Sequence, residues 1–203
     1  MKKISTLYKK DPNNLARVID EVNPENAWVF EVDAIATRKF DGIACAIMDD
    51  IALSESGVIL SKNLYKRYDV KKGKVAPDGA IPCQEPDAIT GHHPHWVKCH
   101  RSDPNDKLFF EGFDALEYKE EGTYELCGES ISTERFKANF NVEKIQGHKL
   151  IKHGSYVFPN ISDLSFEGIR KFLEETDIEG IVFYHPTDGR MCKIRKKDFG
   201  IKR

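Results

Sequence analysis

Short apolar runs, rich in β-branched and aromatic residues and bounded by glycine, proline or other turn residues, dominate this sequence. They predict strands at residues 27–36, 42–48, 57–60, 123–128, 180–184 and 191–194. Apolar residues at helical spacing occur at residues 14–22 and 165–175. The strands do not alternate with helices as they do in βαβ units. The pattern therefore predicts an α+β fold of mainly antiparallel sheets with flanking helices.

Other segments give weaker signals. Residues 96–98, 108–110 and 156–158 are candidate short strands, and the proline-rich stretch at 69–94 predicts a long irregular excursion. Ser165 is the expected cap of the helix at 165–175, with Ser162 as a rival cap. Residues 180–184 and 191–194 are predicted to pair as a hairpin.

The length of 203 residues predicts one domain, residues 1–203. Hydrophobic content of 40% and charged content of 32% are typical of a soluble globular protein. The net charge of -2 does not point to a nucleic-acid partner, but cations concentrate at residues 62–74 and 188–203. These segments either meet on one face and bind phosphates or form two solvated surfaces.

Five cysteines are scattered singly along the chain, which favours a reducing compartment. No segment approaches ~18 apolar residues, and no apolar stretch follows the lysines at the N-terminus. We therefore expect a cytoplasmic protein with no membrane span and no signal peptide.

The run TRKFDG at residues 37–42 places Lys39 at the end of a predicted strand and before a turn. Lysine becomes a nucleophile when desolvation or neighbouring positive charge lowers its pKa. Gly42 would permit a tight turn and the approach of the backbone to a ligand. The motif Lys-x-Asp-Gly is weak alone, because chance produces it in many surface turns.

Five further segments follow in order: SKN with Lys62, YEL with Glu125, SYV with Tyr156, EGIVF from Glu179, and CKIR with Lys193 and Arg195. With the Lys39 segment, they resemble motifs I, Ia, III, IIIa, IV and V of the covalent nucleotidyltransferase superfamily of ligases and capping enzymes. Each motif alone is common. Their shared order, with 140 residues from Lys39 to Glu179, makes the resemblance specific.

This resemblance implies the nucleotidyltransferase (adenylation) domain of ATP-dependent ligases. Lys39 would attack the α-phosphorus of ATP, with Asp41 and Gly42 completing its motif. Cations would neutralise the phosphates, and Lys193 would also take part in catalysis; these cations are Lys62, Lys193 and Arg195. Because positions 193 and 195 alternate on one strand, their side chains share a face.

The same resemblance assigns the carboxylates and an aromatic ring. Glu125 and Glu179 would hold Mg²⁺ or Mn²⁺ and orient the ribose, and Tyr156 would stack on adenine. Glu129, which follows Gly128, is a rival to Glu125. Each of these residues also has a purely structural interpretation. Glu125 would be an exposed strand residue, Tyr156 a core residue, and Glu179 the residue that enters a hairpin. Lys193 and Arg195 would then only guard an edge strand.

Three more segments, IP at 81–82, GHHPHWV at 91–97 and LIKHG at 150–154, narrow the resemblance to the vertebrate-type 5′–3′ RNA ligase family, RNA ligase 1. The segment with Trp96 discriminates most, because generic ligases lack it. Arg38 stands where that family usually has glutamate, and Lys62 where arginine is common. Arg38 would place a cation beside Lys39 and lower its pKa further. We expect no OB domain.

The RNA ligase resemblance implies three steps. ATP adenylylates Lys39, AMP passes to a 5′-phosphate on RNA, and a 3′-hydroxyl attacks that end and releases AMP. The basic segments would hold the RNA backbone.

Other functions compete with this one. A DNA ligase or a GTP-using capping enzyme would share the motifs, and so would a non-catalytic RNA-binding relative. A zinc module is a further alternative, although it has no CxxC pair. Its ligands would come from Cys83, His92, His93, His95, Cys99 and His100.

Overall fold

The computed structural model describes residues 3–54, 57–70, 74–88, 91–128, 143, 145–159 and 161–202. The chain forms two compact units, each built from segments that are distant in sequence. Unit 1 comprises Met1–Lys3 and Asp41–His153, and unit 2 comprises Ile4–Phe40 and Gly154–Arg203. The expectation of a single domain stays a prediction.

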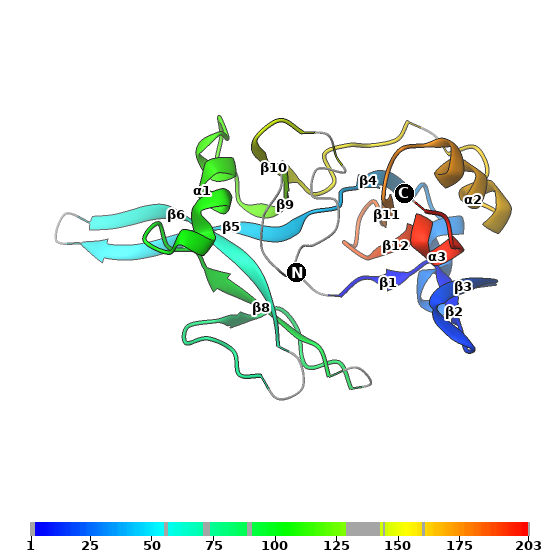
Figure 1. Cartoon of the computed structure of the whole chain (residues 1–203), viewed down its shortest axis with the longest axis horizontal. Coiled ribbons are helices and arrows are strands. Elements are labelled where there is room, and N and C mark those ends of the chain that lie inside the picture. The colour runs from blue at the N-terminus through cyan, green and yellow to red at the C-terminus, as the bar shows by residue number, and fades with distance from the viewer. Residues whose placement is uncertain are drawn as a thin grey trace. The chain divides into compact units, whose positions relative to one another are not determined.

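Unit 1 is built on a six-stranded sheet with the order β10-β9-β5-β6-β8-β7, in which every neighbouring pair is antiparallel. Figure 1 shows β5 and β6 as a long ribbon. The strands are β5 (Ile43–Ser54), β6 (Gly57–Val70), β7 (Ile81–Pro82), β8 (His93–Lys98), β9 (Gly122–Gly128) and β10 (His148–Lys152). A 3-10 turn, η2 (Pro104–Asp106), leads into the helix α1 (Lys107–Asp114).

The two faces of this sheet bury different clusters, because successive strand residues point to opposite sides. On one face, Ile47, Leu64 and Leu126 pack with Phe109 and Phe113 of α1. The other face carries a smaller cluster of Ala46, Tyr65 and Trp96. Glu125 follows Tyr124 and precedes Leu126, so it lies on the face that holds Trp96.

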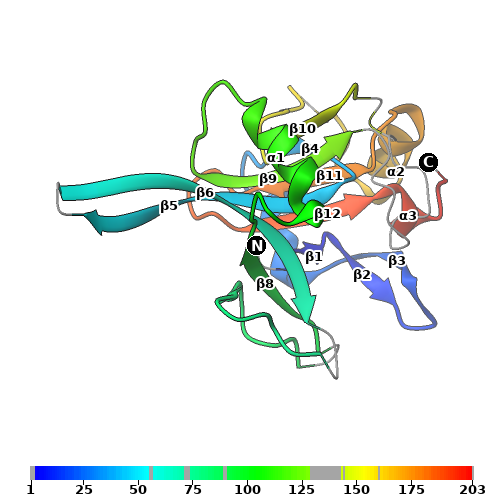
Figure 2. The same ribbon diagram turned by 60° about the vertical axis from the view of Figure 1, so that its left-hand side comes forward.

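Unit 2 is built on a four-stranded sheet with the order β1-β12-β11-β4. β1 (Ser5–Thr6) runs parallel to β12 (Met191–Arg195), whereas β11 (Gly180–Tyr184) is antiparallel to β12 and to β4 (Ile35–Lys39). A separate antiparallel pair joins β2 (Tyr8–Asp11) to β3 (Asn14–Val22). The remaining elements are η1 (Pro24–Phe30), α2 (Phe166–Glu175) and α3 (Lys196–Phe199), and Figure 2 shows them in a turned view.

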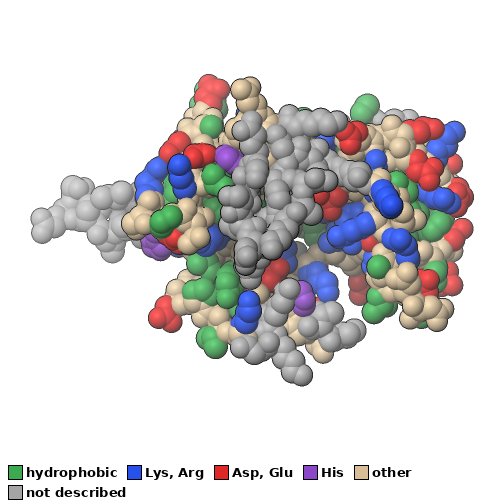
Figure 3. All heavy atoms as spheres, in the orientation of Figure 1, with side chains coloured by type: hydrophobic (Ala, Val, Ile, Leu, Met, Phe, Trp, Pro, Cys, Tyr) green, Lys and Arg blue, Asp and Glu red, His purple; other side chains and the backbone are tan. Residues whose placement is uncertain are grey.

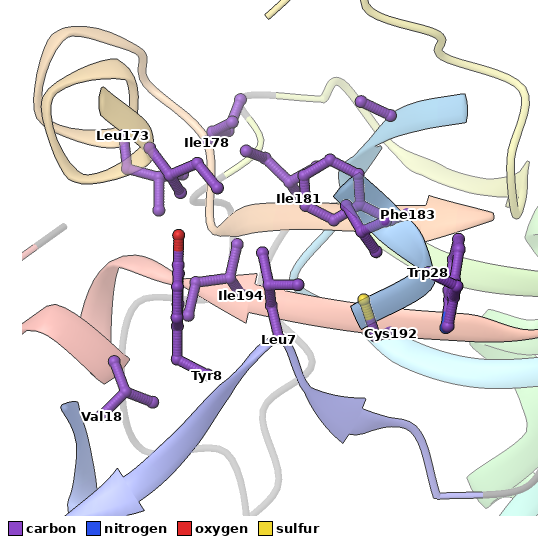
Figure 4. Close-up of a cluster of buried hydrophobic side chains, with 13 residues drawn as sticks. Leu7, Tyr8, Val18, Trp28, Leu173, Ile178, Ile181, Phe183, Cys192 and Ile194 are labelled. Carbon is purple, nitrogen blue, oxygen red and sulfur yellow. The ribbon is translucent and has the colours of Figure 1, made fainter. Parts of the chain in front are cut away.

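One face of the unit 2 sheet packs into an apolar core. Ile181 and Phe183 of β11 and Ile194 of β12 lie in one buried cluster with Leu173 of α2 (Figure 4). Tyr8 also enters this core, and its ring meets that of Phe166 edge to face at 5.0 Å. The opposite face carries the polar residues described below.

The main features of the predicted fold are confirmed. The structure is α+β with mostly antiparallel sheets and few helices. The predicted hairpin is the antiparallel pair of β11 and β12, and Ser165 caps α2 by accepting a hydrogen bond from the Gly168 N–H at 3.1 Å. Residues 156–158 form only an isolated bridge, Thr37 to Val157.

Three predicted elements are wrong. Residues 14–22 form the strand β3, residues 108–110 lie in the helix α1, and most of residues 27–36 form η1 and a turn before β4 begins. In β3 only Val18 is buried and Leu15 is 72% exposed, so its helix-like apolar spacing does not mark a buried face.

The two basic segments belong to different units. Several of their cations are not plain solvated charges, since Lys196 is buried and Arg190 pairs with Asp188 at 2.7 Å. In the space-filling view both signs of charge are interspersed over the visible described surface (Figure 3). Among the described residues, no helix has the length and apolar character that a bilayer span requires.

Candidate active site

Lys39 and Glu179 form an ion pair in unit 2, although 140 residues separate them in the chain. Lys39 ends β4 and pairs in register with Gly180, the residue that follows Glu179. The Lys39 Nζ also donates a hydrogen bond to the Phe40 carbonyl at 3.1 Å. Both side chains are partly shielded, with exposed fractions of 22% and 14%. The sheet register therefore fixes the amine beside a carboxylate.

Gly180 sets the spacing of the three strands at this point. It pairs with Lys39 on one side and Arg195 on the other, so these residues form one row across the sheet. A Cβ at position 180 would lie 2.3 Å from the Ile194 carbonyl oxygen. Only glycine fits this close approach, and it leaves the two flanking side chains without a neighbour between them.

Lys193 lies on the same face as Lys39 and Arg195. It pairs with Val182, which in turn pairs with Thr37. Val182 is two residues from Gly180 along β11. Burial lowers the pKa of Lys193 to about 8, and the positive charges of Arg195 and Lys39 add to this effect. Glu179 and Asp198 act in the opposite direction. The prediction that positions 193 and 195 share a face is confirmed.

Arg38 differs from the expectation. Strand alternation directs it to the face opposite Lys39, the side on which Ala36 enters the core. Its guanidinium carbon lies 4.8 Å from the centroid of the Phe40 ring. The hypothesis that Arg38 places its charge beside the Lys39 amine is therefore wrong.

Tyr156 lies on the surface of unit 2 rather than in its core. Its side chain is 55% exposed, and its ring meets Phe40 edge to face at 5.1 Å and 74°. Its carbonyl accepts a hydrogen bond from the Arg38 N–H at 2.8 Å. This ring is thus exposed and packs at its edge against Phe40, the residue after Lys39.

Glu125 is 8% exposed in unit 1 and belongs to a polar network. Its Oε1 accepts a hydrogen bond from the Gly42 N–H at 3.0 Å, and its Oε2 lies 2.9 Å from His153 Nε2. Because a carboxylate only accepts, Nε2 carries the proton. His153 Nδ1 lies 2.9 Å from the Thr123 hydroxyl. The exposed-strand reading of Glu125 is therefore wrong.

Gly42 packs closely against β9, because a Cβ there would lie 2.2 Å from the Leu126 carbonyl oxygen. Its expected approach to a ligand stays a prediction. Asp41, its neighbour, donates its backbone N–H to Glu143 Oε1 at 2.9 Å. Lys62 forms an ion pair with Asp49 across β5 and β6. The rival acid Glu129 lies outside the described residues.

Three residues of these networks were not predicted as site residues. His153 lies in the LIKHG run, but its contact with Glu125 depends on the pairing of β9 with β10. Asp198 binds both Lys10 and Arg195, and 188 residues separate Lys10 from Asp198. A contact over such a separation leaves no local signal in a sequence.

Within the part of the chain that the structure describes, no three His, Cys, Asp or Glu side chains gather to hold a metal ion. All six Cys and His residues of the zinc alternative lie in that part, so it has no support. Magnesium needs fewer protein ligands, since one or two carboxylates suffice when substrate phosphates complete its shell.

Unit 1 also contains a groove of about 920 Å³. Its lining includes Val97, Phe109 and the ion pair of Lys66 with Asp106. None of the predicted site residues is among the described residues that line it.

Comparison with known protein families places part of the chain in a described family. The family model described as RNA ligase 1 matches residues 95–203, more than half of the chain. No curated protein matches. The matched residues include Glu125, Tyr156, Glu179, Lys193 and Arg195, whereas Lys39 and Lys62 precede them.

Proposed function

Because the chain belongs to the RNA ligase 1 family, we propose that it is an ATP-dependent RNA ligase that joins 5′-phosphate and 3′-hydroxyl ends through a covalent lysyl-AMP at Lys39. Family membership supports RNA ligase function and RNA as the substrate. The proposal of a covalent lysyl-AMP is supported by the ion pair of Lys39 with Glu179. This pair lies on the face that holds Lys193 and Arg195. It brings a nucleophile, a carboxylate and two cations together in unit 2.

The first step is the transfer of AMP to the enzyme. Once its ammonium proton has left to solvent, the Lys39 amine attacks the α-phosphorus of ATP. An N–P bond forms as the nitrogen gives up a second proton to solvent, and pyrophosphate leaves with the electrons of the broken P–O bond. Glu179 Oε2 contacts Nζ and orients it. Lys193 and Arg195 supply positive charge where negative charge develops on the departing phosphates.

The next two steps move AMP and then expel it. An oxygen of the RNA 5′-phosphate attacks the lysyl-AMP phosphorus, the N–P bond breaks, and the Lys39 nitrogen regains a proton. The RNA end then carries a phosphoanhydride. A 3′-hydroxyl attacks the 5′-phosphorus, loses its proton and displaces AMP, which leaves a phosphodiester.

The carboxylates fit divalent-metal binding by their donor chemistry. Glu179 offers carboxylate oxygens beside the nucleophile, with 14% of its side chain exposed, and would hold Mg²⁺ or Mn²⁺ there. A bound divalent cation would supply further neutralisation of phosphate charge. Each Glu125 oxygen has a second lone pair beyond the hydrogen bond described above, so Glu125 suits a ribose hydroxyl or a metal.

The adenine platform is proposed for Tyr156. Its ring is more than half exposed and is held at its edge by Phe40. An aromatic face held in this way can stack on a purine at little conformational cost. Asp41, Gly42 and Lys62 are proposed as further nucleotide contacts.

Incubation with α-labelled ATP and Mg²⁺, followed by a denaturing gel, tests the nucleophile. We expect a covalent label in the wild type and in the control Lys149→Ala, whose lysine is exposed on β10. Lys39→Ala and Lys39→Arg should take no label, and the arginine variant keeps a cation beside Glu179. A label that survives both substitutions would exclude Lys39.

Two comparisons separate the alternatives. Labelled GTP in place of ATP distinguishes a capping-type enzyme, and we expect no label from GTP. A 5′-phosphorylated RNA and the DNA of the same sequence, each offered with a 3′-hydroxyl end, distinguish RNA from DNA ligation. Efficient joining of DNA but not of RNA would overturn the substrate proposal.

A further inference from the structure

Asp198 of α3 is a buried carboxylate that the proposed reaction does not use. Its side chain is 0% exposed, although an isolated ionised carboxylate is costly to bury. The cost is offset by unusually complete hydrogen bonding. Burial acts to raise its pKa, but hydrogen bonds from Arg195 and Lys10 outweigh that effect and hold the pKa below its ordinary value.

Most of these hydrogen bonds come from Arg195. Asp198 Oδ2 accepts from the backbone N–H and from Nε of Arg195, both at 3.0 Å. Asp198 Oδ1 accepts from Arg195 Nη2 at 2.9 Å and from Lys10 Nζ at 2.7 Å. Nε and Nη2 together form the planar fork by which arginine binds a carboxylate in a fixed orientation.

The orientation matters because of where Arg195 lies. Its backbone is in the row with Gly180 and Lys39, so its side chain starts on the face that carries the nucleophile. An arginine without such a partner has many rotamers, and ordering it on a ligand costs free energy. A side chain already fixed by a carboxylate avoids that cost.

We propose that Asp198 is a positioning residue for ATP: it holds the Arg195 guanidinium on the Lys39 face, so that Arg195 meets the triphosphate in one orientation. The proposal rests on the proposed function. Its competitor is a purely structural role, because Asp198 also accepts the Arg195 N–H at the start of α3. The two roles differ in whether the effect of Asp198 passes through the Arg195 side chain.

A double-mutant cycle of Asp198→Asn and Arg195→Met distinguishes them. The dissociation constant of ATP is measured by calorimetry, together with the labelling rate at saturating ATP and the melting temperature. Loss of a charge-assisted contact predicts that each single substitution weakens ATP binding about tenfold. The double variant should bind within about twofold of Arg195→Met, because removing Asp198 then changes nothing further.

Lys10→Met is the matched control. It removes the other cation on Asp198 and leaves all three contacts with Arg195, so we expect ATP binding within about twofold of the wild type. If Asp198→Asn does not fold, Arg195→Lys replaces it, since lysine keeps the charge and cannot form the fork. ATP binding should then weaken as well.

The outcomes that overturn the proposal are distinct from those that overturn the function. If the fold losses in ATP affinity of the two single variants multiply in the double variant, Asp198 acts independently of Arg195. A lower melting temperature with unchanged ATP affinity, or unchanged affinity in Arg195→Lys, would leave only the structural role. A wild type that binds ATP but takes no label contradicts the lysyl-AMP proposal alone, and one that does not bind ATP contradicts both.

Discussion

Lys193 carries its charge in surroundings that oppose it, and this has a measurable signature. Burial and the neighbouring cations lower its pKa from 10.5 to about 8. In ¹³Cε-lysine NMR spectra we expect one resonance that titrates near pH 8 and is absent from Lys193→Met. A Lys193 resonance that titrates at the ordinary lysine value of 10.5 would contradict the desolvation of this side chain.

The same pKa has a consequence for stability. Between pH 8 and 10.5 the unfolded chain binds more protons than the folded chain, so Lys193 makes the free energy of unfolding rise with pH. Below pH 8 its buried ammonium destabilises the fold by roughly 3 kcal/mol. We expect Lys193→Met to be more stable than the wild type at pH 7 and to lose this advantage by pH 10. Urea unfolding at the two pH values measures the difference, and a difference independent of pH would refute the prediction.

Sequence patterns predicted those residues of the candidate site that lie close together in the chain or that belong to an ordered series of motifs. Lys193 and Arg195 share a face because they are two residues apart on a strand, and Glu179 precedes the strand that pairs with β4. The side of the strand to which Arg38 points was missed, because adjacency in sequence was taken as adjacency in space. The anchoring of Arg195 by Asp198 was missed because the contact depends on how α3 follows β12.

Among the secondary-structure elements, α2 tests the capping prediction. Ser165 Oγ accepts the Gly168 N–H, which otherwise has no partner in the first turn. Ser165→Ala should lower the free energy of unfolding by about 1 kcal/mol. Ser162→Ala is the control, since Ser162 is exposed and lies outside the helix. Equal losses in both variants, measured by denaturant unfolding, would contradict the assigned cap.

The spacing of β11 and β12 gives a sharper test. In Gly180→Ala the new methyl group would lie 2.3 Å from the Ile194 carbonyl, so the strands must separate. We expect a loss of about 1–3 kcal/mol, as for other overpacked sites. Gly79→Ala is the comparison variant, because a Cβ at position 79 would meet nothing within 4 Å. Only the positive φ of 72° would lower its free energy of unfolding, by about 1 kcal/mol. Similar melting temperatures for the two variants would refute the close-packing argument.

The errors in element prediction have a common cause. Residues 14–22 have apolar residues at helical spacing, yet pairing with β2 holds them extended and buries Val18. Residues 108–110 contain two phenylalanines, which favour strands, but α1 buries Phe109 and Phe113 against the sheet. Tertiary contacts override local preference in both cases. The β11–β12 hairpin was predictable because its turn and both strands are consecutive in sequence.

For the whole molecule, the proposed chemistry predicts dependence on a divalent cation. Phosphate charge on ATP exceeds what two cations can neutralise, and a carboxylate beside Lys39 adds to it. Excess EDTA should abolish covalent labelling, and Mg²⁺ or Mn²⁺ should restore it. Labelling on a denaturing gel measures the effect, with circular dichroism as the control for folding. Full labelling in EDTA would remove the metal from the proposal.

The interleaving of the two units in sequence also bears on how the protein is made. Unit 2 takes β4 from residues that precede Asp41–His153, the main segment of unit 1, and β11 and β12 from residues that follow it. At ribosomal rates of about 5–20 residues per second, roughly 7–30 s pass between the synthesis of Lys39 and of Glu179. Lys39 therefore acquires its carboxylate partner late in translation, after the whole of unit 1 has been synthesised. Translation itself thus delays assembly of the proposed adenylylation site.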